Sequence, residues 1–283
     1  MTNAPLRYRA APLQNRPRPL EHLKVLRVNT TRNCWMQCRF CDFSRYAPLS
    51  GPRPVPPAVG RTALENELGR GNRYDLIKIR GGLTFWEPWS YFLQLVRVLA
   101  EGSSAAVQAF SAVELMHFHR VEKKPLREML EELRWAGATS LGPGGGELLV
   151  DSWREELAVH RIRSQEWVTV QRLAMEAGLQ SRAMMMVFRG ITRDLVQEHL
   201  LALGPLRDLS VIEIKPLRPQ GTHMENAQPP HLLEMLAVVQ AIQDLWPQVQ
   251  IAVTADSVSP DALAILHRHG VSMAYFNAEE IGP

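Results

Sequence analysis

Residues 33–43 read Asn-Cys-Trp-Met-Gln-Cys-Arg-Phe-Cys-Asp-Phe, and this run holds the three cysteines of the chain, Cys34, Cys38 and Cys41. Three residues separate the first two cysteines, and two residues separate the second from the third. Four thiolates saturate an ordinary [4Fe–4S] cluster. A short loop with three thiolates can therefore bind three irons of such a cluster and leave the fourth iron open. The spacing predicts a [4Fe–4S] cluster with one iron free for another ligand.

A zinc ion, a disulfide and a packed core are alternatives to the cluster that the sequence leaves open. A zinc ion needs a fourth donor, for which the chain offers nine histidines, but its usual cysteine pairs are spaced differently. A disulfide leaves one thiol over, and neighbouring cysteines on a short loop rarely meet disulfide geometry. Cysteines that only fill a core are expected to scatter along a chain. We favour the cluster because the three cysteines are so close in sequence.

This spacing, with Phe40 directly before the third cysteine, resembles the radical S-adenosylmethionine (SAM) superfamily. The flanking residues 28–34 and 39–45 are similar to the branch that contains the menaquinone (futalosine-pathway) synthases and the deazaflavin synthases. The resemblance implies that Cys34, Cys38 and Cys41 bind a [4Fe–4S] cluster whose open iron chelates SAM. It also implies an external electron donor of the flavodoxin or ferredoxin type, and contact between Phe40 and the cofactor.

The composition is that of an ordinary globular protein, with 46% hydrophobic and 22% charged residues in 283. No apolar run is long enough for a membrane helix, and no secretory signal is visible. Clustered, reduced cysteines then predict a cytoplasmic protein. The net charge of +3 is small and its basic residues are dispersed, so nucleic acid is not an expected partner. We expect an extended arm over residues 1–23 and a single barrel domain over residues 24–283.

Strand-like runs alternate with helical runs, which is typical of βα units. The eight expected strands cover residues 24–30, 75–80, 107–111, 138–141, 180–187, 210–215, 250–254 and 271–277. This pattern predicts an α/β fold, a TIM-like (βα)8 barrel, with the cysteine loop at the carboxyl end of its first strand. Residues 45–60 are rich in proline and predict a loop. A helix that ends near Gly178 is expected to have Ser164 as its N-cap.

Two glycine-rich runs follow predicted strands. Gly81 and Gly82 follow the second strand, and Gly144, Gly145 and Gly146 follow the fourth. Glycine lets a backbone approach a ligand closely, whereas turn chemistry or a flexible loop accounts for the same residues without a ligand. The resemblance implies that the Gly81 and Gly82 carbonyls hold the SAM amino group and that residues 144–146 also lie against the cofactor.

The resemblance also suggests residues around the reacting groups. Residues 109–114, Ala-Phe-Ser-Ala-Val-Glu, look like a segment of aminofutalosine synthase. Glu114 is therefore a candidate for ribose binding or proton transfer, although a first-turn helix residue is an equal alternative. The fifth strand puts Arg182, Met184 and Met186 on one face, where we expect Arg182 to bind a carboxylate and the methionines to face SAM, unless they are only core. Candidates for the substrate site are Thr84, Lys215 and Arg218.

The expected function is that of a radical SAM enzyme of menaquinone biosynthesis that acts on a small molecule. The resemblance favours an aminofutalosine synthase-like reaction, in which a 5′-deoxyadenosyl radical adds to an enolpyruvyl benzoate. A radical cyclase like cyclic dehypoxanthinyl futalosine synthase is the alternative within the branch. A non-catalytic iron–sulfur or electron-transfer protein, or a zinc-binding module, is the alternative from another class.

Overall fold

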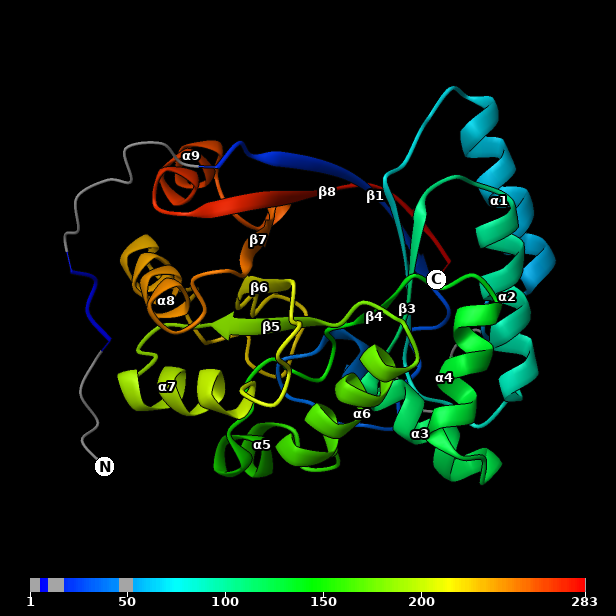
Figure 1. Ribbon diagram of the computed structural model, residues 1–283, viewed down its shortest axis with the longest axis horizontal. Helices are drawn as coiled ribbons and strands as arrows, with labels where there is room; N and C mark the ends of the chain where they lie inside the picture. Colours follow the sequence, from blue (N-terminus) through cyan, green and yellow to red (C-terminus); the bar gives the residue numbers. More distant parts are fainter. Residues whose placement is uncertain (1–5, 10–17, 46–52, 283) are drawn as a thin grey trace.

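Eight parallel strands form one sheet, in the order β4-β3-β2-β1-β8-β7-β6-β5 (Figure 1). The computed structural model describes residues 6–9, 18–45 and 53–282. The strands are β1 (Glu21–Asn29), β2 (Leu76–Arg80), β3 (Ala106–Ser111), β4 (Ser140–Gly142), β5 (Arg182–Val187), β6 (Val211–Pro216), β7 (Gln250–Thr254) and β8 (Val271–Ile281). The predicted α/β architecture is confirmed.

The two ends of this sheet meet between β4 and β5, so that the strands make a nearly closed ring. Ser140 forms an isolated parallel bridge with Gln180. The backbone N–H of Leu141 donates to the Gln180 carbonyl at 3.0 Å, and the N–H of Gln180 donates to the Thr139 carbonyl at 3.0 Å. The predicted TIM-like barrel is therefore confirmed. The pairing that closes it between β4 and β5 is a single isolated bridge.

The first and last strands are neighbours in the ring. β1 pairs with β8 from Glu21 opposite Met273 to Val28 opposite Ile281. The Glu280 carboxylate on β8 accepts from Arg27 at 2.6 Å and from Arg32 at 2.9 Å. The last strand thus anchors the residues that lead into the cysteine loop.

Helices cover the outside of the ring, with α1, α2 and α4 on one side and α7, α8 and α9 on the other (Figure 1). Outward-facing strand residues such as Leu26, Val28 and Ile77 are buried beneath them, as expected for a parallel sheet covered by helices. The helices are α1 (Pro57–Gly69), α2 (Trp89–Glu101), α3 (Ala112–Glu122), α4 (Leu126–Trp135), α5 (Asp151–Leu157), α6 (Ser164–Glu176), α7 (Arg193–Ala202), α8 (Leu232–Leu245) and α9 (Pro260–Arg268), with 3-10 turns η1 (Asp42–Arg45) and η2 (Ala255–Ser257).

The interior of the ring holds charged side chains as well as an apolar cluster that includes Val25, Leu76 and Val211, whereas branched aliphatic side chains dominate the interior of most such barrels. The Nζ of Lys78 on β2 lies 3.7 Å from the Glu213 carboxylate on β6 and 3.7 Å from the centre of the Tyr275 ring on β8. Neither β6 nor β8 is adjacent to β2 in the strand order, so these contacts cross the interior of the ring. The barrel therefore encloses charged groups that a purely structural core does not need.

Among the boundaries that differ from the sequence predictions, three concern the arm, the proline-rich loop and the N-cap of α6. β1 begins at Glu21, so part of the predicted arm belongs to the barrel. α1 begins at Pro57, inside the predicted loop 45–60, because proline is well suited to the first turn of a helix. Arg163, and not Ser164, is the N-cap of α6, since both the N–H and the hydroxyl of Ser164 bind the Asp151 carboxylate instead. Residues 1–5, 10–17 and 46–52, which these predictions also covered, lie outside the described residues.

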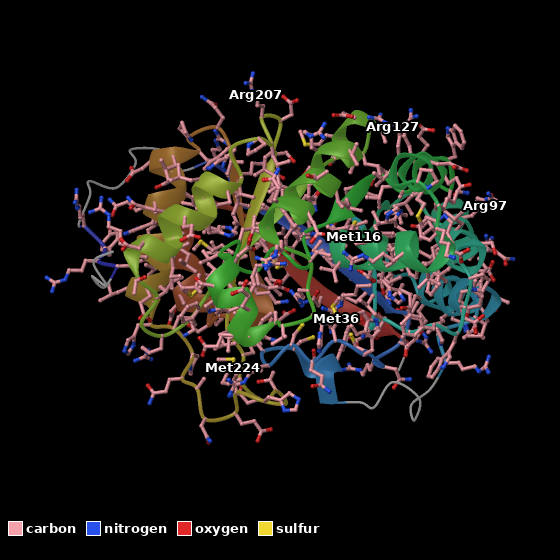
Figure 2. All side chains as sticks on the ribbon, turned by 90° about the horizontal axis from the view of Figure 1, so that it is seen from below. Met36, Arg97, Met116, Arg127, Arg207 and Met224 are labelled. Atoms are coloured by element: carbon pink, nitrogen blue, oxygen red, sulfur yellow. The ribbon has the colours of Figure 1, made fainter. Side chains whose placement is uncertain are left out.

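The labelled arginines and the buried Met36 lie in different parts of the molecule. Figure 2 shows Arg97, Arg127 and Arg207 at the edge, and Met36 of the cysteine loop toward the middle of the view. Met36 is buried. Among the helices of the described residues, none has the length and apolar character needed to cross a bilayer.

Candidate functional site: the cysteine loop and its neighbours

The cysteine loop follows β1 directly and is tied to the residues that follow β2. The backbone N–H of Thr30 donates to the Arg80 carbonyl at 2.8 Å, and the N–H of Gly82 donates to the Thr31 carbonyl at 2.7 Å. The N–H of Trp35 donates to the Leu83 carbonyl at 3.2 Å. These bonds fix the entry to the loop at the carboxyl end of the barrel, as predicted.

Gly81 and Gly82 are required by this contact between the two loops. A Cβ atom on Gly81 would lie 1.9 Å from the Thr30 hydroxyl, and one on Gly82 would lie 1.9 Å from the Asn33 carbonyl oxygen. Any side chain at either position would therefore push the cysteine loop away. Their predicted contact with the SAM amino group stays a prediction.

The three cysteines lie on one partly enclosed loop, and none of them forms a disulfide. Cys38 is buried, and Cys34 and Cys41 are half-buried. Burial raises the pKa of each thiol above its ordinary value, whereas the positive charge of Arg161 acts on each in the opposite direction. The three sulfurs lie close enough that the charge of one raises the pKa of another.

This donor set fits an iron–sulfur cluster better than a single metal ion. Ligands of one zinc ion must converge on one point, and in the part of the chain that the structure describes no three His, Cys, Asp or Glu side chains do so. Cluster ligands instead bind different irons, so their sulfurs need only surround a common space. Three thiolates add negative charge, which the neighbouring Arg161 offsets. In the described part of the chain all three cysteines are free thiols, which contradicts the disulfide alternative.

Arg161 is the site residue that the sequence did not single out. Its Nε donates to the Cys38 sulfur at 3.0 Å, and its Nη1 donates to the Glu147 carboxylate. The guanidinium also lies 5.0 Å from the centre of the Phe40 ring. Burial alone would lower the pKa of Arg161, but the charges of Cys38 and Glu147 raise it, so this residue stays a cation.

Residues on the far side of β4 reach across to the cysteine loop. The backbone N–H of Arg39 donates to the Leu157 carbonyl of α5 at 2.9 Å. The rings of Phe40 and Trp153 are 5.3 Å apart. Together with Arg161, these contacts close over the loop from the segment between β4 and α6, and they explain why Phe40 occupies its position.

The glycine run after β4 is closely packed against neighbouring side chains. A Cβ on Gly145 would lie 2.2 Å from Val113, and one on Gly146 would lie 2.7 Å from the Trp167 ring. The indole N–H of Trp167 donates to the Gly144 carbonyl at 3.1 Å. This packing accounts for the glycines and directs Glu147, the next residue, toward Arg161.

Glu114 is the third residue of α3 and caps it. One carboxylate oxygen accepts from the N–H and the hydroxyl of Ser111 at 2.7 and 2.6 Å, and the other accepts from the N–H of Gly81 at 3.0 Å. Burial raises the pKa of Glu114 to about 7 in spite of these bonds. The capping alternative is confirmed, and the carboxylate also holds the glycine pair; a role in chemistry stays a prediction.

The structure does not bring Arg182 to the cysteines. Arg182 is the first residue of β5, at the opposite end of the barrel from the cysteine loop, and its Nη1 donates to the Tyr275 hydroxyl at 2.7 Å. Met184 and Met186 share its face and are buried, and the N–H of Met186 donates to the Glu147 carbonyl at 2.7 Å. Of these three, Met186 is thus linked to the Arg161 pair.

The remaining substrate candidates separate into two groups. Lys215 lies half-buried near the carboxyl end of β6. Burial acts to raise the pKa of the Glu147 carboxyl, but the charge of Arg161 and, to a smaller extent, that of Lys215 lower it below its ordinary value. The Thr84 carbonyl accepts from His117 at 2.7 Å beside the cysteine loop. Arg218 is exposed and donates to the Asp256 carbonyl after β7, so the structure does not join it to the other two.

The chain resembles enzymes of the predicted branch. It is 28% identical over 186 residues to aminodeoxyfutalosine synthase of Thermus thermophilus, covering 65% of this chain and 49% of that protein. It is 25% identical over 194 residues to cyclic dehypoxanthine futalosine synthase of Halalkalibacterium halodurans, covering 68% and 51%. A transferase of Methanosarcina acetivorans, 5-amino-6-(D-ribitylamino)uracil–L-tyrosine 4-hydroxyphenyl transferase, is 28% identical over 182 residues, covering 64% and 47%. No family model matches the chain.

Together with the three-cysteine loop, these likenesses agree with the predicted resemblance to the radical SAM superfamily. Among solved structures, methylornithine synthase has the same fold, with a TM-score of 0.70 at 16% identity over 90% of this chain and 72% of that one. The chain spans about half the length of the curated relatives named above.

Proposed function

We propose that this protein is a radical SAM enzyme whose reaction is of the aminofutalosine synthase kind. The observation that carries the proposal is the cysteine loop, with three thiols at the carboxyl end of β1 beside the largely buried Arg161. When bound there, a [4Fe–4S] cluster supplies the electron that splits SAM into methionine and a 5′-deoxyadenosyl radical. An external one-electron donor of the flavodoxin or ferredoxin type is the expected source of that electron.

The residues of the chain have distinct parts in this proposal. Cys34, Cys38 and Cys41 hold the cluster, and Arg161 orients the Cys38 sulfur. Enclosure of the loop by residues from α5 and by Phe40 keeps water away from a reactive intermediate. Met184 and Met186 give the interior an apolar face on which the SAM nucleoside can lie.

The interior of the barrel suits an anionic substrate. The Nε2 of Gln108 and the Nε of Arg182 are buried without a hydrogen-bond partner. Lys78, Lys215 and Arg182 lie close enough to Glu213 that their positive charges lower the pKa of its carboxyl against the effect of burial. Orphaned donors and surplus cations favour carboxylates. The enolpyruvyl benzoate used in the aminofutalosine reaction carries two carboxylates, and the similarity of residues 109–114 to that enzyme favours this substrate.

A radical cyclase of the cyclic dehypoxanthinyl futalosine synthase kind is the second candidate. The relative from Halalkalibacterium halodurans carries a similar name, and the glycine run after β4 together with the methionines of β5 favours it. The two candidates differ in where the adenosyl group ends, because the synthase joins it to the product and the cyclase releases 5′-deoxyadenosine.

One experiment tests the proposal and separates these candidates. The protein is reconstituted anaerobically with iron and sulfide, given SAM and dithionite with the enolpyruvyl benzoate, and its products are identified by mass spectrometry. An adenosyl adduct supports the synthase, and 5′-deoxyadenosine alone supports the cyclase. A full cluster that never cleaves SAM would make this a non-catalytic iron–sulfur protein and overturn the proposal.

A further inference from the structure

Arg161 and Glu147 form an ion pair against one sulfur of the cysteine loop. The side chains of Arg161 and Glu147 are only 11% and 12% exposed. The Nη1 of Arg161 donates to the Glu147 carboxylate, and its Nε donates to the Cys38 sulfur at 3.0 Å. The guanidinium fork thus bonds to both groups at once, as its fixed geometry allows.

The neighbouring structure holds this pair in place. Arg161 follows α5, where its backbone N–H donates to the Ala158 carbonyl at 2.8 Å. The Glu147 carbonyl accepts from Met186 on β5 at 2.7 Å. Phe40 covers one face of the guanidinium. A buried arginine is costly unless it is paired, so an apolar side chain would fill this place with less cost if no charge were needed beside Cys38.

We propose that Arg161 is a positioning residue that raises the reduction potential of the cluster through its N–H···S bond to Cys38, and that Glu147 limits this rise. The inference rests on the proposed function, because it requires that Cys38 ligates a [4Fe–4S] cluster. Reduction adds one electron to the cluster and its sulfurs. A cation and a hydrogen bond at a ligating sulfur stabilise the reduced state more than the oxidised state, and a nearby carboxylate does the opposite.

The two members of the pair therefore have opposite effects, which a purely structural pair would not produce. Removing the charge of Arg161 is expected to shift the midpoint potential to more negative values. Removing the negative charge of Glu147 is expected to shift the midpoint potential to more positive values. Glu147→Gln is suited to this test because the amide oxygen can still accept from Arg161 and keep it in place. Arg161→Lys keeps the charge but loses the planar fork, so an intermediate negative shift is expected.

The test is a redox titration of the reconstituted protein in the absence of SAM, in which the reduced cluster is monitored by electron paramagnetic resonance. The variants are R161Q, R161K and E147Q. The matched control is R163Q, which removes an arginine from the same segment; Arg163 pairs with Glu155 at 3.1 Å, and both side chains are well exposed. The control is expected to leave the midpoint unchanged. Iron and sulfide contents are measured for each protein, so that loss of cluster is not mistaken for a shift.

Opposite shifts for R161Q and E147Q support the inference. Equal midpoints for wild type, R161Q and E147Q, or shifts of the same sign, would overturn it. If R161Q fails to retain a cluster, R161K and E147Q decide by the same criterion. A wild-type protein that assembles no [4Fe–4S] cluster would instead refute the proposed function itself, which keeps the two failures distinct.

Discussion

Replacing Gly82 with alanine is expected to displace the cysteine loop. The new Cβ would lie 1.9 Å from the Asn33 carbonyl oxygen and 3.0 Å from the Cys34 Cβ. Both contacts involve the loop close to its backbone, which cannot turn aside as the end of a long side chain can. Overpacking of this kind costs about 1–3 kcal/mol, and we expect the upper end of that range. The loop would also carry Cys34 with it.

The assay is chemical denaturation of G82A and wild type, together with the iron bound after anaerobic reconstitution. Gly69→Ala is the matched control, because a Cβ at Gly69 meets nothing within 4 Å and Gly69 ends helix α1. Alanine there is expected to be neutral or to stabilise by up to about 1 kcal/mol. If G82A matched wild type in both unfolding free energy and iron content, the packing argument for the glycine pair would be wrong.

Three further predictions concern other residues. Cys38→Ala should abolish SAM cleavage, measured as 5′-deoxyadenosine by mass spectrometry, while far-ultraviolet circular dichroism stays that of the wild type. Burial raises the pKa of Glu114 to about 7, above the unfolded value of about 4.3. The stability that its proton contributes is therefore fully present below the unfolded pKa and is lost as the pH rises through 7. The wild-type unfolding free energy should fall relative to that of Glu114→Gln between pH 5 and 8, and no such fall would contradict this. Arg154 donates to the carbonyls of Gly145, Leu148 and Ile162, so Arg154→Ala should cost about 3 kcal/mol or more in denaturation, since each buried carbonyl left without a partner costs about 1–3 kcal/mol.

The barrel and the cysteine loop could be predicted because their signals are local. Strands buried on both faces appear as short apolar runs between helical runs, and three cysteines within one loop need no distant residue to be recognised. The predicted boundaries were wrong where a local rule had an exception: the proline-rich run predicted a loop, but Pro57 begins helix α1.

Arg161 could not be predicted because its partner Cys38 is 123 residues away in sequence. Nothing near Arg161 marks it as different from the neighbouring Arg163, which pairs with exposed carboxylates. The prediction that Arg182 lies beside the cofactor was not supported for another reason. Alternation along a strand indicates which face a residue occupies, but not whether the residue lies at the carboxyl end of the barrel, near the cysteines, or at the opposite end.

The pairing of the earliest strand with the latest one has a consequence for how the protein matures. As the ribosome releases the chain, β1 and the cysteines emerge more than 200 residues before β8 and its Glu280. Until then one edge of β1 has no neighbour, and such an edge readily joins the wrong partner. Iron insertion is therefore expected to follow synthesis of the eighth strand, so that a loaded cluster marks a closed barrel.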